Sequence, residues 1–571
     1  MSTVVVVKGV APQLHAHWSE RIAHGVLIAI VALLLIGLFG PLLAILKQAV
    51  WPQDSDGFAW QAFAAYFASP ALLHSLWNSV WVSALVTIIV IPLAFAFAYA
   101  LTRSCMPAKG WFRTVTLLPL LAPSMLSAIS LIYWFGNQGM AKSFWGALGF
   151  DSIYGAPGIV LAECFAVFPH ALMILVTALT LADARLYEAA DAMGTSTWRK
   201  FITITLPGAK YGMISASLVT FTLVLTDFGI PKVVGGNFNV MATDVFKLVI
   251  GQQDFQRGAV VALLLLAPAV LTFAVDYHVQ RRQSAMLTAR AVPLRVTPSR
   301  RFDAGMTLYC LVIGGLMLAM FGMAVFASLA KFWPYDLTLS LNHYIFGLVD
   351  AELGEALINS VQMAAATAIF GPMLVFVGAY VMEKTRGMQA LRSLLRFMVM
   401  LPMAVPGLVL GLGYIFFFNA PSNPLQVLYQ SMPLLVLCTT VHFYTTGHLT
   451  LVTALKAIDS EFEAVSNSLK VPFYKTFWKV TLPICLPALL DVSRYFFINA
   501  MTTISAVVFL YSPDTKLASV AILNLDESGE ISAAAAMAVL IVCISLLATA
   551  VYGVLGRLLA RTTQAWRQPQ S

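Results

Sequence analysis

Charged residues are scarce in this chain of 571 residues. Lys, Arg, Asp and Glu together make up 11% of it, whereas a soluble globular protein averages about 25%. Hydrophobic residues make up 60%, and the mean hydropathy is +0.83. A soluble core could not enclose so much apolar surface. The composition therefore excludes a soluble globular protein and predicts a polytopic membrane protein.

Several chemical signatures are also missing. The six cysteines form no Cys-x-x-Cys pair and lie mostly in or beside apolar runs, so we expect neither a disulfide framework nor a metal centre. No Gly-x-x-x-x-Gly-Lys-Ser/Thr phosphate loop is present, so the chain should not bind ATP itself. No nucleophile–base set stands out. These absences argue against an enzyme and against a bound cofactor.

The net charge of +8 does not indicate a nucleic-acid partner, because most of the basic residues fall in alternate connecting segments. This distribution matches the positive-inside rule. It predicts that both termini are cytoplasmic and that the basic side chains meet the lipid head groups of the bilayer.

Long apolar runs dominate the chain, and we count about twelve that could span a membrane as helices of roughly 20 residues. The period-2 alternation of barrel strands is absent, so we predict an all-α integral membrane protein. The runs start near Val26, Asn78, Val115, Gly158, Met213, Gly258, Met306, Ala356, Phe397, Leu434, Leu489 and Ala533.

The sequence repeats itself. The pentapeptide Leu-Val-Thr-Ala-Leu occurs at 175–179 and again at 451–455, Asn-Ser-Val opens runs at 78 and 359, and a pair of prolines recurs in the third and ninth runs. We therefore predict two halves of six spans, residues 1–290 and 300–571. An even number of spans makes the repeats parallel, related by an axis along the membrane normal.

Each half carries one long polar loop on the basic side, which we call the first loop (183–207) and the second loop (459–483). The first loop predicts a short helix over 183–192, a turn at Gly194 and a second short helix over 195–204, with Pro207 starting the next element. A simple connector needs about five residues, so a repeated loop of this length is expected to be held by a partner.

The first loop resembles the Glu-Ala-Ala ("EAA") loop of ABC importer permeases: Glu188-Ala189-Ala190, then Gly194, then Leu206-Pro207. In that family the loop is a coupling helix that sits in a groove of a separate ATPase subunit. The resemblance implies a type I ABC importer permease fold, with ATP and Mg bound by the partner ATPase dimer. The second loop departs from the pattern, since Lys470 replaces the glycine and Glu463 lies one residue early, so the two ATPase contacts need not be equivalent. The implied coupling residues are Glu188, Ala189, Ala190, Gly194, Arg199 and Pro207, with Glu463, Ala464, Lys470, Lys475 and Pro483.

Two fused halves resemble the permeases of the ferric-iron, polyamine and 2-aminoethylphosphonate importers. Stretches such as 226–232, 250–253 and 511–516 are most similar to the last group. The resemblance implies import of a small polar solute, 2-aminoethylphosphonate, from a periplasmic solute-binding protein across the bacterial inner membrane. Ferric iron or a polyamine is the alternative cargo, and an ion-driven secondary transporter is the alternative class.

Polar residues near the ends of the fifth and eleventh spans are candidates for the substrate path, because polar groups inside a membrane are costly. The competing interpretation is that these groups only pack helices together. We expect Glu163, His170, His442, Tyr444 and His448 to be interhelical polar groups. The path candidates are Thr222, Thr226, Asp227, Asn499, Thr502 and Thr503. The long segment 229–256 predicts either a re-entrant helix or an ordinary connector.

Overall fold

Helices make up most of the described part of the chain in the computed structural model. It describes residues 18–563 apart from 52–59, 287–293, 295, 350, 386, 460 and 470. Within this part the only strands are β1 (Ala330–Phe332) and β2 (Asp336–Leu339), which pair as an antiparallel hairpin. The predicted all-α class is confirmed. Most of the predicted boundary between the halves (287–293 and 295) lies outside the described residues, and we keep the term "half" for the two repeats.

Short π-helical and 3-10 segments, labelled η, join or continue the α-helices. The first half contains α1 (Trp18–Leu34), η1 (Leu35–Phe39), α2 (Gly40–Val50), α3 (Trp60–Ala68), α4 (Pro70–Arg103), α5 (Lys109–Leu117), η2 (Leu118–Leu121), α6 (Met125–Phe135), α7 (Lys142–Ala147), α8 (Ala156–Thr180), α9 (Ala184–Ala192), α10 (Thr197–Lys200), η3 (Phe201–Thr205), α11 (Leu206–Thr226), α12 (Gly229–Val234), α13 (Met241–Phe246), η4 (Lys247–Gly251) and α14 (Phe255–Met286). The second half contains, besides the hairpin, α15 (Arg300–Leu329), α16 (Asn342–Val349), α17 (Ala351–Lys384), α18 (Gln389–Met400), η5 (Leu401–Ala404), α19 (Gly407–Phe418), η6 (Pro424–Leu428), α20 (Met432–His442), α21 (Tyr444–Lys456), α22 (Glu461–Ser468), α23 (Phe473–Thr476), η7 (Phe477–Thr481), α24 (Leu482–Thr502), η8 (Pro513–Thr515), α25 (Ala518–Glu527) and α26 (Ile531–Thr563).

In the described residues, nine helices are long and apolar enough to cross a membrane, or up to eleven if two bent pairs each count as one span. Three of the expected spans are therefore not single straight helices. The runs that start near Val115 and Phe397 are the bent pairs, and the run near Leu434 is divided into α20 and α21 at Phe443.

Prolines explain the two bent spans. The chain turns by 102° between η2 and α6 and by 114° between η5 and α19. Ala122, before Pro123, and Val405, before Pro406, have extended backbones. Proline disfavours the helical conformation of the residue before it and cannot donate a backbone hydrogen bond. The repeated prolines therefore break the third and ninth spans at equivalent places.

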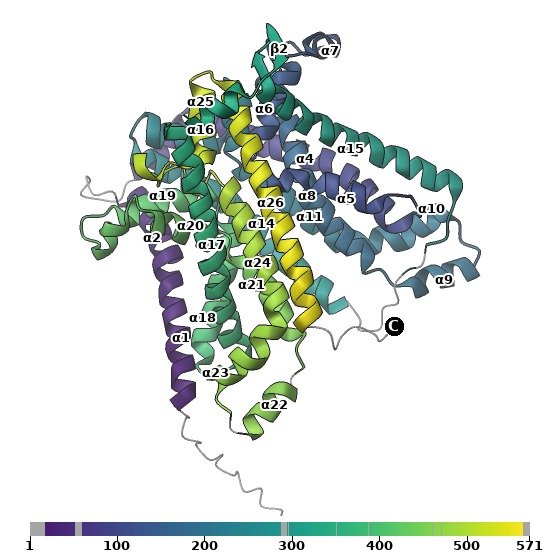
Figure 1. The fold of residues 1–571 in the computed structure, drawn as a ribbon, viewed down its shortest axis with the longest axis vertical. Coiled ribbons are helices and arrows are strands. Elements are labelled where there is room, and N and C mark those ends of the chain that lie inside the picture. Colours follow the sequence, from purple (N-terminus) through teal and green to yellow (C-terminus); the bar gives the residue numbers. More distant parts are fainter. Residues whose placement is uncertain are drawn as a thin grey trace, which may run out of the picture.

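The first span of each half packs against the other half. Helices α1 and α2 contact α17, α18 and α19 of the second half, whereas α15 lies along α4, α5 and α6 of the first. Figure 1 shows α1 beside α17 and α18, and α15 across the top of the first-half helices. Because helices in lipid are held together by close packing, this exchange joins the two halves.

The repeated Asn-Ser-Val sequence anchors two buried helices. The hydroxyl of Ser79 accepts a hydrogen bond from the backbone N–H of Met241 (2.8 Å), and that of Ser360 accepts one from Ala518 (2.7 Å). These are the first residues of α13 and α25, so the two helices are repeat equivalents. The first five residues of α13 are buried, and so are five of the six residues of α12, so the segment 229–256 contains two buried short helices and is not an ordinary connector.

Candidate functional site: two repeated loops and a polar crossing

The first loop begins with helix α9. The side chain of Asp183 caps this helix by accepting a hydrogen bond from the backbone N–H of Arg185 (3.1 Å), which satisfies a donor that the first turn leaves free. At the other end, the N–H of Thr195 donates to the carbonyl of Ala190 (3.0 Å), and Gly194 has φ of +67°. This left-handed conformation favours glycine. The loop contains the predicted helix and the predicted glycine turn.

The second loop is closed in the same way. The side chain of Asp459 accepts a hydrogen bond from the N–H of Glu461 (3.0 Å) at the start of α22, and the N–H of Val471 donates to the carbonyl of Ser466 (2.9 Å). Lys470, which stands where the first loop has its glycine, and the side chain of Glu463 lie outside the described residues. The helix of each loop therefore has equivalent hydrogen bonds at both ends.

The structure corrects the expected separate helix over 195–204. Residues Thr197–Thr226 form one continuous helical segment, in which the π turn η3 precedes Pro207. A proline ring clashes with the carbonyl four residues earlier in an α-helix, and the wider π turn relieves that clash. The same arrangement of η7 and Pro483 makes Phe473–Thr502 continuous. Each loop therefore continues directly into a long apolar helix.

Side-chain contacts fix the first loop against this long helix. The hydroxyl of Tyr187 on α9 shares a hydrogen bond with that of Thr205 (2.9 Å), and Lys200 forms an ion pair with Asp191. The guanidinium of Arg103, at the end of α4, lies 5.3 Å from the centre of the Tyr187 ring, a favourable cation–π geometry. A movement of α9 would therefore be transmitted to α4 and to the segment that becomes α11.

A different side-chain hydrogen bond fixes the second loop. The hydroxyl of Ser466 on α22 shares a hydrogen bond with that of Thr476 on α23. The position equivalent to Tyr187 holds Glu463. Each loop helix therefore has a side-chain hydrogen bond to the segment that follows it, made from a different position in each loop.

Both loops expose a row of large apolar side chains that the sequence analysis missed. Leu186 (59% exposed) and Met193 (76%) occupy the same repeat positions as Phe462 (46%) and Leu469 (71%), and Val465 lies between the last two. Exposed apolar side chains that cluster on a helix mark an interaction surface. The signal was available in the sequence, because the same seven-residue spacing of apolar residues recurs in two otherwise polar loops.

Most of the predicted coupling residues are accessible to a partner. Ala190 is buried against the protein, and Pro483 is half-buried. The exposed ones among the described side chains are Glu188, Ala189, Gly194, Arg199, Pro207, Ala464 and Lys475.

Four of the six path candidates have hydrogen bonds within their own helix, each to the carbonyl one turn earlier: Thr222 (2.9 Å), Thr226 (2.9 Å), Asn499 (2.8 Å) and Thr502 (3.0 Å). Thr222 also shares a hydrogen bond with Thr272 of α14 (2.7 Å). Helix α11 packs against α4, α8 and α14, and α24 packs against α17, α21 and α26. The helix-packing interpretation therefore suits these four better than a shared path between α11 and α24.

Asp227 differs from the other path candidates, because it lies in the break between α11 and α12 and meets another carboxyl group. Its Oδ2 accepts a hydrogen bond from the N–H of Ile230 (2.8 Å), and its carboxyl group also bonds the hydroxyl of Ser124 and the carboxyl of Glu163. Glu163 is thus an interhelical group, as expected. The pairing itself was missed, although both acids align with threonines, Thr439 and Thr503, in the second half.

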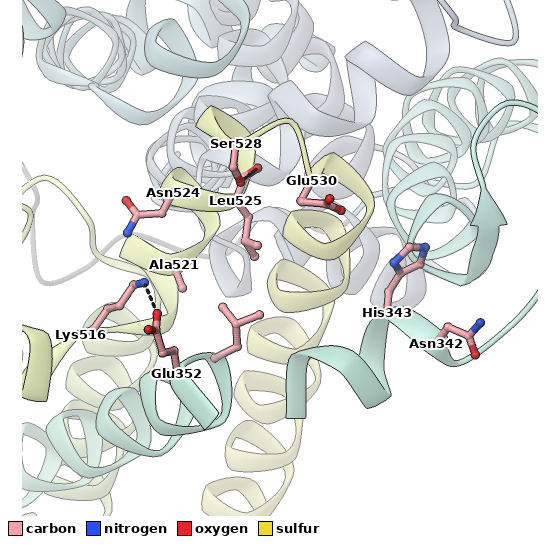
Figure 2. Close-up of a pocket in the computed structure, with 10 residues that line it drawn as sticks. Asn342, His343, Glu352, Lys516, Ala521, Asn524, Leu525, Ser528 and Glu530 are labelled. Atoms are coloured by element: carbon pink, nitrogen blue, oxygen red, sulfur yellow. Dashed lines mark hydrogen bonds and ion pairs between the residues drawn. The ribbon is translucent and has the colours of Figure 1, made fainter. Parts of the chain in front are cut away.

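A pocket of about 460 Å³ with several polar lining residues (Figure 2) lies near α16 and α25, at the end of the molecule away from α9 and α22 (Figure 1). Residues from α16, α17 and α25 line it, and the ammonium of Lys516 lies 3.8 Å from the carboxylate of Glu352. Among the described residues, no group of three or more His, Cys, Asp or Glu side chains is arranged to hold a metal ion.

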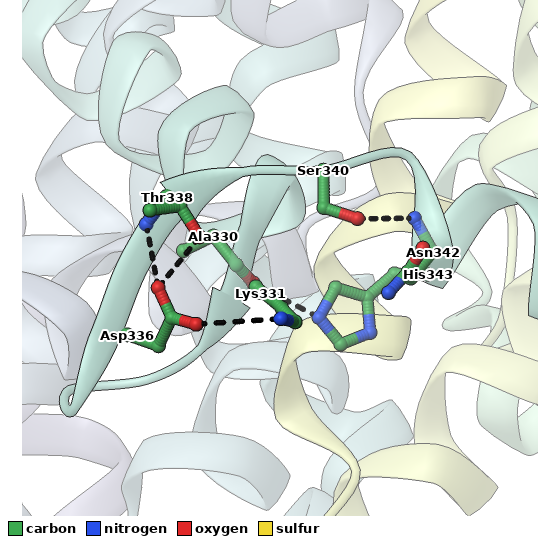
Figure 3. Close-up of polar contacts among 7 residues, drawn as sticks. All are labelled: Ala330, Lys331, Asp336, Thr338, Ser340, Asn342 and His343. Atoms are coloured by element: carbon green, nitrogen blue, oxygen red, sulfur yellow. Dashed lines mark hydrogen bonds and ion pairs between the residues drawn. The ribbon is translucent and has the colours of Figure 1, made fainter.

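The β1–β2 hairpin lies next to this pocket (Figure 3). The ring of His343 contacts the carbonyl of Ala330 (3.0 Å), and Asp336 accepts hydrogen bonds from the N–H (3.1 Å) and the hydroxyl (2.6 Å) of Thr338. These bonds hold the pKa of Asp336 below its usual value, and Lys331, 3.6 Å away, acts in the same direction. The hairpin therefore fixes the start of α16, which supplies His343 to the pocket.

A protein-family model described as "Binding-protein-dependent transport system inner membrane component" matches the chain twice, at residues 90–285 and 374–561. The two matches together cover more than half of the chain, and each contains one of the two loops.

Curated relatives align over most of the chain. The "Ferric transport system permease protein FbpB" of Actinobacillus pleuropneumoniae is 27% identical over 90% of this chain and 76% of its own length. The "Putative ferric transport system permease protein FbpB 1" of Haemophilus influenzae is 27% identical over 86% and 78%. The "Probable ABC transporter permease protein y4fN" of Sinorhizobium fredii is 24% identical over 94% and 97%.

Among solved structures, one chain of a bacterial ABC transporter "involved in the import of the acidic polysaccharide alginate" is 15% identical to this chain. The superposition covers 47% of this chain and 97% of that one, with a TM-score of 0.40.

Proposed function

The chain belongs to the family of binding-protein-dependent transport system inner membrane components, and from that premise we propose that it imports ferric iron, driven by a separate ATPase. It is a transport subunit with both permease halves in one polypeptide. The observation that carries the cargo proposal is the alignment with two ferric transport permeases over most of the chain.

The sequence-based expectation of 2-aminoethylphosphonate remains a prediction, and the relatives favour its ferric alternative. The ion-driven alternative has no support from the family, whose members are permeases of binding-protein-dependent systems. Asp227 and Glu163 add a chemical reason for a cationic cargo, since hard cations prefer carboxylate oxygens.

Two partners follow from this proposal. An ATPase dimer would contact the first loop with one protomer and the second loop with the other, and a periplasmic solute-binding protein would deliver the cargo at the opposite end. The chain would lie in the bacterial inner membrane with both termini in the cytoplasm, as the distribution of basic residues predicts. ATP and Mg would be bound by the ATPase alone.

The exposed apolar side chains of the two loops support docking of the ATPase. The continuous helical segments that follow the loops supply the mechanical link to the membrane region. Nucleotide-driven closure of an ATPase dimer would move the two loops. Because each loop continues through a π turn into a long helix, the movement would tilt α11 and α24 and alternate access to the path between them and their neighbours.

The experiment that tests the cargo is uptake into proteoliposomes that contain the permease and its ATPase, with the cognate binding protein and ATP. Radioactive ferric iron and radioactive 2-aminoethylphosphonate are offered in parallel. ATP-dependent accumulation of iron alone supports the proposal. Accumulation of 2-aminoethylphosphonate without iron would refute it and restore the earlier expectation.

A further inference from the structure

The two helix breaks of the first half touch each other beside α8. One break separates η2 from α6 at Ser124, and the other separates α11 from α12 at Asp227. A Cβ atom on Gly229 would lie 2.5 Å from the hydroxyl oxygen of Ser124, so only glycine allows this approach. We call the place where these segments meet the polar crossing, comprising Ser124, Glu163, Asp227 and Gly229.

The carboxyl groups of Glu163 and Asp227 interact with each other at the polar crossing. The Oδ2 atom of Asp227 also accepts a hydrogen bond from the backbone N–H of Ile230 (2.8 Å). Two acids from different helices therefore meet where the chain leaves α11.

Glu163 is poorly satisfied by the protein alone. Its side chain is 1% exposed, and its Oε1 atom has no hydrogen-bond partner. A buried polar atom without a partner costs about 1–3 kcal/mol, and a carboxyl group inside a membrane protein is costly in any case. Packing does not explain why this position keeps an acid.

The second half shows that the fold does not need the acids. Its crossing is built by Gly407, where a Cβ atom would lie 2.6 Å from the hydroxyl oxygen of Ser505. Thr439 stands in place of Glu163 and donates to the carbonyl of Leu435 within its own helix (2.8 Å), and Thr503 stands in place of Asp227. The same close approach of two broken helices is thus achieved without carboxyl groups.

We propose that the polar crossing of the first half is a transit site for a hard, oxygen-seeking cation. The carboxyl groups of Glu163 and Asp227 and the hydroxyl of Ser124 would be its oxygen ligands. Two carboxylates suit a site that must release its cargo, whereas a resident metal centre needs more ligands. The inference rests on the proposed cationic cargo and names where that cargo passes.

The first test is iron uptake by Glu163→Gln and Asp227→Asn in the reconstituted system. Glutamine has the size of glutamic acid and can donate an N–H to Asp227, but it cannot supply a carboxylate ligand. We expect both variants to lose at least about tenfold in iron uptake, with thermal stability and ATPase activity stimulated by the binding protein retained. Thr220→Val, which changes a fully buried hydroxyl without a partner on the neighbouring α11, should stay within about twofold.

The second test measures the site without transport. Terbium(III), a hard luminescent cation, is titrated into the purified permease and the two variants. Saturable binding by the wild type, lost in both variants, supports the proposal. Wild-type iron uptake by a folded Glu163→Gln protein would overturn the transit site and leave the proposed function intact. If the glutamine variant does not fold, Asp227→Asn decides on the same criteria.

Discussion

Tyr187 on α9 and Thr205 at the end of η3 share a hydrogen bond of 2.9 Å, which ties the first loop to the helix that enters the membrane region. The bond connects two elements 18 residues apart. The second half has Glu463 at the position of the tyrosine. A signal that enters through α9 therefore has a direct route to α11.

We expect Tyr187→Phe to lower the amount of solute imported per ATP hydrolysed by roughly two- to fivefold, because the loop helix is then tied less firmly to α11. The loss of one hydrogen bond should change stability by only about 1 kcal/mol. The matched control is Thr203→Val, since the Thr203 hydroxyl only donates within its own helix, to the carbonyl of Arg199 (2.7 Å). An unchanged transport-to-hydrolysis ratio in Tyr187→Phe would contradict this role.

The exposed apolar rows predict where the ATPase binds. Leu186→Glu or Phe462→Glu should weaken co-purification of the ATPase, and the double variant should abolish it, because a charge cannot enter an apolar groove without loss of hydration. Leu148→Glu is the control, as Leu148 is similarly exposed (55%, against 59% for Leu186) but lies at the opposite end of the first half. Full retention of the ATPase by the double variant would show that the loops are not its docking surface.

The Ser–Gly contact at each crossing predicts a rescue. Gly229→Ala should destabilise the protein by about 1–3 kcal/mol, because the new methyl group overlaps Ser124. The double variant with Ser124→Gly and Gly229→Ser reproduces the arrangement of Gly407 and Ser505. It should therefore have most of the thermal stability that Gly229→Ala loses. Gly208→Ala, where a Cβ atom meets nothing within 4 Å, should be neutral. Equal melting temperatures for Gly229→Ala and Gly208→Ala would rule out the close contact.

Asp526 predicts a pH dependence of stability. Burial, reinforced by the charge of Glu527, raises its pKa to about 6, while Lys232 acts in the opposite direction. The folded state therefore binds more protons than the unfolded state between the usual carboxyl pKa of about 4 and pH 6, so stability falls as the pH rises through that window. Asp526→Asn should remove this fall and raise the melting temperature above pH 6 by roughly 1–2 °C.

Measurement of melting temperatures between pH 4.5 and 7.5 checks this expectation. Asp336→Asn is the control, because hydrogen bonds from Thr338 lower the pKa of Asp336 and place its titration below the window. A wild-type profile parallel to that of Asp526→Asn would refute the assignment.

Local features of the loops could be predicted from the sequence because they depend on near neighbours. Asp183 caps the helix that directly follows it, and Gly194 takes the left-handed turn that glycine tolerates. The continuation of Thr197–Thr226 into one helix could not be predicted in the same way. Proline usually starts a helix, and only the π turn at 201–205 allows Pro207 to stand inside one.

The polar crossing could not be predicted from the sequence, for a different reason. Pro123 belongs to the repeated pair of prolines. The presence of a proline does not predict the angle of the bend that it produces, which is 102° here. Without that bend Ser124 would not approach Gly229. The pairing of the two acids therefore depends on tertiary geometry rather than on their separation along the chain.

Because the first span of each half packs against the other half, neither half can form a complete helix bundle alone. If the polypeptide were cut between α14 and α15, the N-terminal fragment would lack the helix that lies along α4, α5 and α6, and the C-terminal fragment would lack the helices that cover α17, α18 and α19. Each fragment contains the helices that the other fragment lacks. During synthesis, α1 therefore lacks its neighbours α17 and α18 until the second half has been made.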